Sequence, residues 1–141
     1  MQLSAAPTRR DRDQITRVTI DQGVHFVRIA IPDLRTHDIN RLRTELSALY
    51  EPGAPLRIAL SLKRVNILSS ACMGMFVEFS NALAPVGGSL VLYEVPRDIA
   101  KVLKKLKLHK NLPISKNANT ARRLLCAQQT DSRVPSHESA A

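Results

Sequence analysis

The stretch LRIALSLKRVNILSSACMGMFVEFSNAL, residues 56–83, decides the fold of this chain. It opens on an apolar run, Leu56–Leu62, that is apolar on both faces of its first half, as in a central strand covered on both sides. A basic, polar turn follows, and then two hydroxyl residues, Ser69 and Ser70. The apolar segment behind them, Ala71–Leu83, predicts a helix that is apolar around most of its circumference and substantially buried.

The two serines stand where a helix is expected to begin. A serine at this place can cap the helix, because its oxygen accepts a hydrogen bond from a free amide group of the first turn. The same amide groups and the helix dipole also stabilise negative charge. One or both serines therefore lie where an added phosphate is tolerated and remains visible to a partner. The alternative is that Ser69 and Ser70 only cap the helix.

The segment before residue 56 predicts a hairpin and one helix. Residues 15–20 and 24–31 read as two strands around the turn Asp21-Gln22-Gly23. Thr36 can cap an amphipathic helix that runs from about His37 to Tyr50. The sequence that follows it, with Pro52, Gly53 and Pro55, stops this helix.

The segment after residue 83 continues the alternation of strands and helices. A strand is expected at Ser89–Tyr93, and a helix with Pro96 at its first position is expected to reach about Leu106. Its core-facing residues are expected to be Ile99, Val102, Leu103 and Leu106. A short edge strand at Ile114 and a last helix, capped by Asn117 or Asn119, complete the pattern.

Strands that alternate with helices after a first hairpin predict an α/β fold. We expect a single domain over residues 15–126, with a mixed, mostly parallel sheet of about four or five strands and about four helices. The polar segments 1–14 and 127–141 are expected to be disordered tails.

The composition favours a binding protein over an enzyme. The four histidines, His25, His37, His109 and His137, form no catalytic triad, and together with Cys72 and Cys126 they show no metal-ligand spacing. No glycine-rich phosphate loop is present. We therefore expect no catalytic residue, no metal and no cofactor. Cys72, inside the apolar helix, is expected to be a small core residue.

The chain of 141 residues is 44% hydrophobic and carries a formal net charge of +9. Nine basic residues and one acid fall between residues 97 and 123. Such a charge indicates either an acidic partner or only good solubility. The amino-terminal residues do not resemble a signal peptide, and no apolar run approaches the roughly 18 residues of a spanning helix. We expect a cytoplasmic protein without membrane insertion.

The order of elements and the stretch Ser69–Met75 resemble the STAS domain of bacterial anti-sigma factor antagonists. Residues 60–75 follow the spacing of that family's strand, turn and serine-led helix. Residues 88–96 and 102–108 resemble two of its later motifs. The resemblance extends over about residues 15–126 and implies the STAS fold.

The resemblance also implies a function in partner switching. The unmodified protein would bind an anti-sigma factor that is also a serine kinase, phosphorylation would release it, and a serine phosphatase would restore it. Aligned on the Ser-Ala pair, Ser70 takes the phosphorylated position, and a register one residue earlier would make it Ser69. The implied partner-binding residues are Asp33, Leu34, Lys63, Arg64, Asn66, Ser69, Ser70, Ala71 and Gly74.

Two alternatives remain open. The chain departs from the family pattern at Pro32, Ser61, Ser69 and Cys72, which favours a STAS-like adaptor of a transporter ATPase or signalling complex that is never phosphorylated. The basic segment 97–123 allows nucleic-acid binding as a less favoured alternative, since few aromatic residues are available for base stacking.

Overall fold

The computed structural model describes residues 14–133 of the chain. Within them, a five-stranded sheet has the strand order β1-β2-β4-β6-β7, in which β1 and β2 are antiparallel and all other neighbours are parallel. The predicted α/β fold with a mixed, mostly parallel sheet is confirmed. The strands of this sheet are β1 (Thr16–Asp21), β2 (Val24–Ile29), β4 (Arg57–Ser61), β6 (Ser89–Tyr93) and β7 (Ile114–Ser115).

Four α-helices accompany the sheet in the described part of the chain: α2 (Ile39–Ser47), α3 (Ser70–Leu83), α4 (Arg97–Lys105) and α5 (Ala118–Arg133). The smaller elements are a two-stranded sheet of β3 (Asp33–Leu34) and β5 (Ile67–Leu68), and three 3-10 turns, η1 (Thr36–Asp38), η2 (Ala84–Val86) and η3 (Leu108–Lys110). The sequence did not predict β3 and β5, because a two-residue strand has no readable periodicity.

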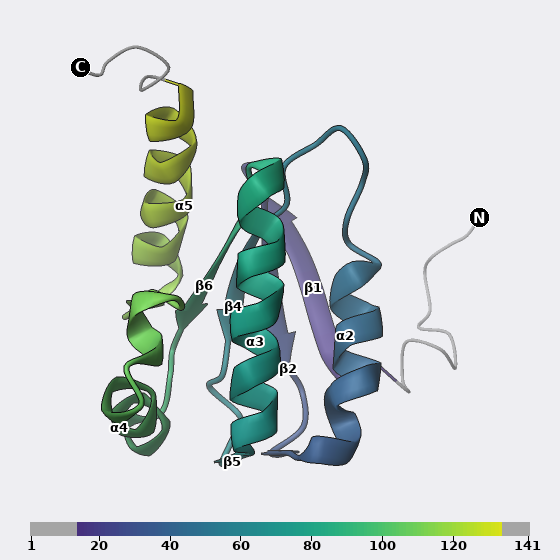
Figure 1. Cartoon of the computed structure of the whole chain (residues 1–141), viewed down its shortest axis with the longest axis vertical. Helices are drawn as coiled ribbons and strands as arrows, with labels where there is room; N and C mark the ends of the chain where they lie inside the picture. Colours follow the sequence, from purple (N-terminus) through teal and green to yellow (C-terminus); the bar gives the residue numbers. More distant parts are fainter. Residues whose placement is uncertain (1–13, 134–141) are drawn as a thin grey trace.

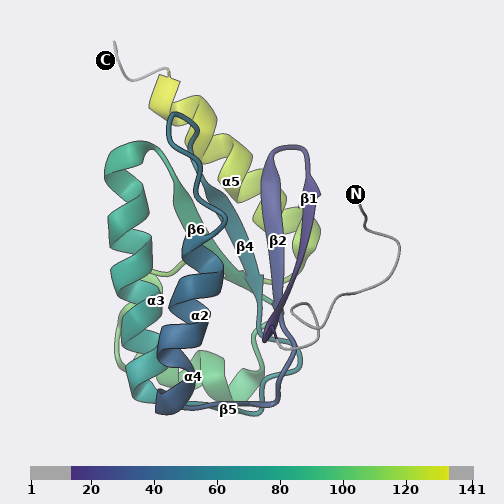
Figure 2. The ribbon, with the colours of Figure 1, turned by 90° about the vertical axis from the view of Figure 1, so that its right-hand side faces the viewer.

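The helices form two layers, with α2 and α3 on one face of the sheet and α5 on the other (Figure 1 and Figure 2). The chain steps from β2 to β4 to β6 in one direction along the sheet. Because crossovers between parallel strands are right-handed, both connecting helices fall on the same face. The opposite face is left to α5, which follows the last strand.

The central strand β4 joins the two layers of the core, because all five of its residues are buried. Its side chains alternate between the faces. Ile58 and Leu60 belong to the larger apolar cluster, with Phe76 of α3. Ala59 belongs to the smaller cluster on the α5 side, with Val91 of β6. Each large apolar side chain buried in this way contributes roughly 1.5–3 kcal/mol, so burial on both faces fixes β4 at the centre, as its sequence predicts.

The predicted hairpin is confirmed, with β1 and β2 joined by the two residues Gln22 and Gly23. Both have positive φ angles, 53° and 78°. A two-residue turn of this kind matches the twist of the strands that flank it, and glycine adopts the second position without steric strain.

The first helix begins later than predicted. The expectation that Thr36 caps it is wrong, because Thr36 begins η1 and α2 begins at Ile39. The carboxylate of Asp38 instead accepts a hydrogen bond from the backbone N–H of Arg35 at 3.0 Å. This hydrogen bond ties Asp38, the third residue of η1, back to the N-cap residue Arg35. At the start of α2 itself, the Asp38 side chain makes no cap hydrogen bond.

Helix α3 is buried on one side only. Its residues Cys72, Met73, Met75, Phe76 and Leu83 are buried. The other side exposes Ser70, Ala71, Gly74, Glu78 and Ala82. The prediction of a substantially buried helix therefore holds for the side that faces the sheet. The small residues of the first two turns stay at the surface.

Helix α4 buries a narrower face than its apolar pattern predicts. Ile99 and Leu103 are buried, but Val102 is 41% exposed and Leu106 is 52% exposed. The expectation that all four face the core is wrong for these two residues. The helix lies at the lower end of the sheet (Figure 1), and there the core covers only the strip of α4 that carries Ile99 and Leu103. It begins at Arg97, so Pro96 precedes the helix and is not its first residue.

The last helix begins as predicted and continues farther. The side-chain oxygen of Asn117 accepts from the backbone N–H of Thr120 at 2.9 Å, which identifies it as the cap. The helix extends to Arg133, so the expected boundary after residue 126 falls inside α5. The remaining parts of the predicted tails, residues 1–13 and 134–141, lie outside the described residues. None of the helices in residues 14–133 is long and apolar enough to cross a membrane.

Gly88, just before β6, stands where another residue does not fit. A Cβ atom added there would overlap the backbone carbonyl oxygen of Leu56. We predict that Gly88→Ala lowers the free energy of unfolding by about 1–3 kcal/mol, the usual effect of overpacking. Urea denaturation measures this change.

The matched control is Gly74→Ala in α3, where the added methyl group meets no atom within 4 Å. Alanine is the better helix former, so this substitution should raise the free energy of unfolding by about 0.5–1 kcal/mol. Similar effects of the two substitutions would contradict the close approach at Gly88.

Candidate functional site

The loop that leads into α3 is fixed by backbone hydrogen bonds to the loop after β2. The amides of Asn66 and Ile67 donate to the carbonyl oxygen of Pro32, at 2.7 and 3.1 Å. The amide of Ser69 donates to the carbonyl oxygen of Leu34 at 3.0 Å. Between these hydrogen bonds, β3 and β5 pair in parallel. The loop after β2 therefore fixes the position of the start of α3.

Ser69 is the N-cap of α3. Its backbone is extended, with φ −68° and ψ 152°, and its Oγ accepts a hydrogen bond from the amide of Cys72 at 3.1 Å. The side chain is half-buried. The hydroxyl of Ser69 therefore serves the helix start, as the sequence allowed for either serine.

Ser70 is the first residue of the helix, and it is exposed. Its hydroxyl has no hydrogen-bond partner among residues 14–133, in contrast to that of Ser69. The amides of Ser70 and Ala71 belong to the first turn, whose N–H groups have no acceptor within the helix. The hydroxyl thus lies at the positive end of the helix dipole, in contact with solvent.

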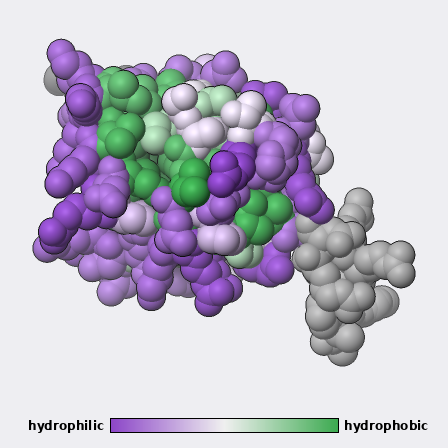
Figure 3. Space-filling model, turned by 90° about the horizontal axis from the view of Figure 1, so that it is seen from below, coloured by the Kyte–Doolittle hydropathy of each residue, from purple (hydrophilic) through white to green (hydrophobic). Residues whose placement is uncertain are grey.

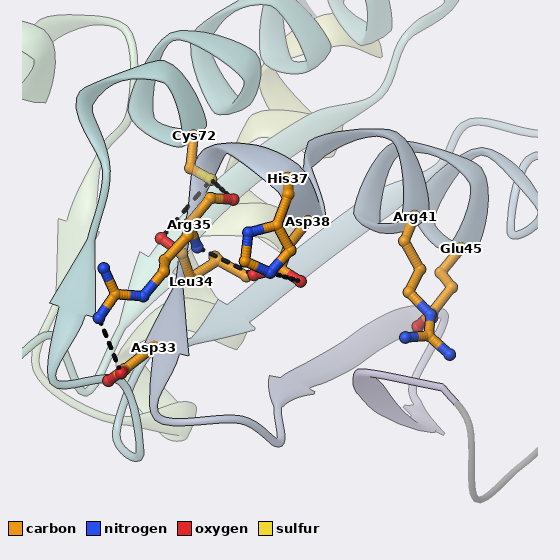
Figure 4. Close-up of polar contacts among 8 residues, drawn as sticks. All are labelled: Asp33, Leu34, Arg35, His37, Asp38, Arg41, Glu45 and Cys72. Carbon is orange, nitrogen blue, oxygen red and sulfur yellow. Dashed lines mark hydrogen bonds and ion pairs between the residues drawn. The ribbon is translucent and has the colours of Figure 1, made fainter.

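Cys72 connects the first turn of α3 to the loop after β3. Its Sγ donates to the carbonyl oxygen of Arg35 at 3.3 Å and lies 3.8 Å from that of Leu34 (Figure 4). The residue is fully buried, so the prediction of a small core residue is confirmed. Burial raises the pKa of the Cys72 thiol, and the nearby Asp38 adds to the rise. The side chain is therefore a neutral thiol near pH 7.

The charged groups next to this loop are paired among themselves. The guanidinium of Arg35 lies 3.1 Å from the carboxylate of Asp33, and His37 Nε2 lies 3.5 Å from Asp38 Oδ1 (Figure 4). In the described residues no group of three or more His, Cys, Asp or Glu is placed to hold a metal ion. The surface beside Ser70 thus carries an exposed ion pair, between Arg35 and Asp33.

The structure brings together six residues at the start of α3, which we call the docking face: Asp33, Asn66, Ile67, Ser70, Ala71 and Gly74. Asp33 is half-buried and the other five are exposed. Five of the six are among the residues that the sequence singled out. The sequence did not single out the sixth residue, Ile67, which is apolar and yet 43% exposed.

Three other residues singled out from sequence, Leu34, Lys63 and Arg64, are not among the six residues of the docking face. The side chain of Leu34 is fully buried, so it takes no part in an exposed surface, and only its carbonyl oxygen serves the site. Lys63 and Arg64 line a cavity together with residues of β1 and β2. Their position after β4 did not reveal which side of the sheet they would face.

Apolar side chains gather on the lower face of the molecule, where α3 begins (Figure 3). Val102 of α4, Leu106 directly after this helix and Ile67 of β5 are exposed at this end. Sequence reasoning missed this surface because it assigned the apolar residues of α4 to the core. An exposed apolar patch of this kind is typical of a surface that binds another protein.

The two serines should differ in their effect on stability. We predict that Ser69→Ala lowers the free energy of unfolding by about 1 kcal/mol, because the N-cap hydrogen bond is lost. Ser70→Ala should change it by less than about 0.5 kcal/mol, as at other exposed positions. Chemical denaturation of both variants tests this, and the reverse order would assign the cap to Ser70.

Cys72 should be protected from thiol reagents. In the variant Cys126→Ser, where Cys72 is the only thiol, we predict far slower modification in buffer at pH 8 than in concentrated urea, because reaction requires opening of the first turn. The raised pKa of Cys72 also makes the free energy of unfolding depend on pH. The neutral thiol contributes stability that is present below the ordinary pKa, about 8.5, and is lost as the pH rises through the higher folded pKa. Equal rates in buffer and in urea would contradict the burial of Cys72.

Comparison with known proteins agrees with this architecture. An anti-sigma-factor antagonist (STAS) domain protein from Planctomyces limnophilus is 19% identical, with a TM-score of 0.66 over 80% of this chain and 97% of that chain. The unphosphorylated form of the anti-sigma factor antagonist SpoIIAA is 15% identical, with a TM-score of 0.63 over 77% and 95%. The phosphorylated form of SpoIIAA from Bacillus is 16% identical, with a TM-score of 0.58 over 77% and 98%.

Among curated proteins, no sequence matches the chain. The family model of the STAS domain, however, matches residues 16–121. This match includes the whole sheet and the start of α5, and it confirms the resemblance found in the sequence: the chain belongs to the STAS domain family.

Proposed function

We propose that this chain is an anti-sigma factor antagonist, a regulatory module whose docking face binds an anti-sigma factor and is switched by phosphorylation of Ser70. The observation that carries the proposal is the exposed Ser70 hydroxyl at the first helical position of α3. A kinase can reach this oxygen without opening the fold. The role is one of binding, with chemistry performed on the domain by other proteins.

The environment of the two serines supports Ser70 over Ser69 as the phosphate acceptor. The oxygen of Ser69 already accepts the hydrogen bond from the Cys72 amide and is half-buried. Phosphorylation of Ser69 would disturb the cap, which contributes about 1 kcal/mol to stability. Phosphorylation of Ser70 leaves that hydrogen bond in place.

A phosphate on Ser70 is compatible with the fold. It adds a charge of about −1.5 to −2 at pH 7. At a helix N-terminus, negative charge is stabilised by about 0.3–1 kcal/mol. Of the structurally similar proteins, SpoIIAA is known in both phosphorylated and unphosphorylated forms, which supports a fold of this type that tolerates the group.

The same phosphate is poorly compatible with a bound partner. The surface beside Ser70 consists of Ala71, Gly74 and the apolar Ile67, with Val102 and Leu106 exposed on the same end of the molecule. If a partner covered this surface, the phosphate on Ser70 would lose its hydration without gaining a positive charge to pair with. The switch therefore acts by excluding the partner, while the core is unchanged. In this scheme the anti-sigma factor is itself the serine kinase, and a serine phosphatase reverses the modification.

We predict that Ser70→Ala retains the anti-sigma factor and that Ser70→Asp loses it. A loss of about 3 kcal/mol corresponds to a weakening of roughly a hundredfold. The measurement is a titration of the purified anti-sigma factor of the same organism with wild type and both variants. Mass spectrometry after incubation with that protein and ATP shows whether one phosphate is added, and whether Ser70→Ala prevents it.

The control variant is Ser69→Asp, which places the same charge one residue earlier, at a good capping position. It should bind the partner more tightly than Ser70→Asp does. Equal affinity of wild type, Ser70→Ala and Ser70→Asp would remove Ser70 as the switch.

The second candidate function is that of an adaptor that is never phosphorylated. Two observations favour it: Ser61, where the family pattern has an acidic residue, is 1% exposed and donates to Glu94 at 2.8 Å, and Ser69 supplies no carboxylate beside Ser70. A kinase that reads acidic groups before its serine finds none in this chain at those positions. Absence of phosphate in the mass measurement, together with retained partner binding, would support the adaptor over the switch.

A further inference from the structure

The face of the sheet opposite α3 carries a cavity that the proposed switch does not use. Helix α5 lies beside the upper part of this face (Figure 2) and covers it with Ala121 and Leu125. At the carboxyl ends of β2, β4 and β6 on this face lie Arg28, which is exposed, and Ser61 and Tyr93, which are buried. A cavity of 510 Å³ lies there, within the usual size range of small-molecule sites.

Strand register places a row of polar residues along one side of this cavity. Arg17 of β1 is opposite Arg28 of β2. Arg28 is opposite Ser61 of β4, and Ser61 is opposite Tyr93 of β6. All four line the cavity. Arg17 and Arg28 are both exposed, and because directly opposed like charges destabilise a sheet, an anion bound between them would offset this repulsion.

Two more positively charged side chains line the same cavity. Lys63 and Arg64, from the loop after β4, also line the cavity. Neither they nor Arg28 form a salt bridge within residues 14–133, and Arg17 donates only to backbone carbonyls. With Glu94 as the one acid, the lining carries four positive charges and one negative charge, a net +3.

Side chains fixed by hydrogen bonds and ring contacts form the interior of the cavity. Ser61 donates to the Glu94 carboxylate at 2.8 Å, and Glu94 is held in a left-handed conformation with φ 52°. Phe26 packs edge-on against Tyr93, with 6.0 Å between ring centroids. Burial, and then the Glu94 carboxylate, raise the pKa of Tyr93, so its hydroxyl stays protonated and can donate. The site thus offers cations, one hydroxyl donor, one fixed carboxylate and the part of the Phe26 ring that the guanidinium of Arg122, 5.4 Å from the ring centroid, leaves free.

We propose that this cavity binds a small organic phosphate monoester, whose phosphate lies among Arg17, Arg28 and Arg64 and whose organic part lies against Phe26. Arginine guanidinium groups bind phosphate oxygens in a bidentate manner. A dianion offsets more of the +3 charge than a carboxylate would. The fixed carboxylate of Glu94 can accept a hydrogen bond from a hydroxyl of the ligand.

The test is a titration of the full chain with phenyl phosphate, followed by amide NMR at constant ionic strength. We expect saturable shift changes at residues 26–28, 61–64 and 93–94. Arg28→Gln and Arg64→Gln should each weaken binding by about tenfold, as expected for loss of one hydrogen bond to a charged group. The matched control is Arg97→Gln on the exposed side of α4, with the same change in charge, and it should leave the affinity unchanged.

Several outcomes would overturn the site. Equal weakening by Arg97→Gln, or shifts spread over all basic residues, would show unspecific attraction of anions. Equal affinity for inorganic phosphate and for phenyl phosphate would show that the organic part of the ligand adds nothing to binding. Binding only to vesicles that contain phosphatidic acid would assign the phosphate to a lipid headgroup. Ser70→Asp should bind phenyl phosphate as wild type does, so this site and the proposed switch can fail separately.

Discussion

The carbonyl oxygen of Leu34 is the contact on which the proposed site depends. It accepts the amide of Ser69 at 3.0 Å and lies 3.8 Å from the thiol of Cys72. These contacts join the loop after β2 to the first turn of α3, although 34 residues or more separate them in sequence. The junction turns the Ser69 hydroxyl inward, toward the Cys72 amide, and leaves Ser70 outside. Chemistry at Ser70 is thereby separated from the core that lies beneath it.

The order of the strands gives the two faces of the sheet different tasks. Because α2 and α3 both cross on one face, that side is filled by a large apolar core, and only its end, at the docking face, is open. The other face has a single helix, α5, and beyond it Arg28 at the end of β2 is exposed, whereas Ser61 and Tyr93 at the ends of β4 and β6 are buried. In the proposed scheme, one end of the fold presents small and apolar residues to a protein partner, and the back of the sheet presents arginines to an anion. Four basic residues of the chain, which has a net charge of +9, lie on this second surface.

The sequence predicted those features that depend on local pattern. The strand β4, the hairpin turn and the exposed serine follow from apolar runs, a glycine and capping chemistry, which act within a few residues. It did not predict that Val102 and Leu106 are exposed, because periodicity shows which residues share a helix face but not how wide a strip the rest of the fold covers. It named Lys63 and Arg64 as partner-binding residues, which stays a prediction, but it did not predict that they line a cavity with Arg28, because the pairing of β2 with β4 is a property of the whole sheet. Long-range placement of this kind has no signature in the residues themselves.

The central claim is that a phosphate on Ser70 changes the surface and leaves the fold intact. The most direct measurement is an amide NMR comparison of the unmodified chain with chain in which phosphoserine is encoded at position 70. We expect shift changes confined to β3, β5 and residues 66–74, and a free energy of unfolding altered by no more than about 1 kcal/mol. Changes that extend through β4 and α2, or a marked loss of stability, would contradict it.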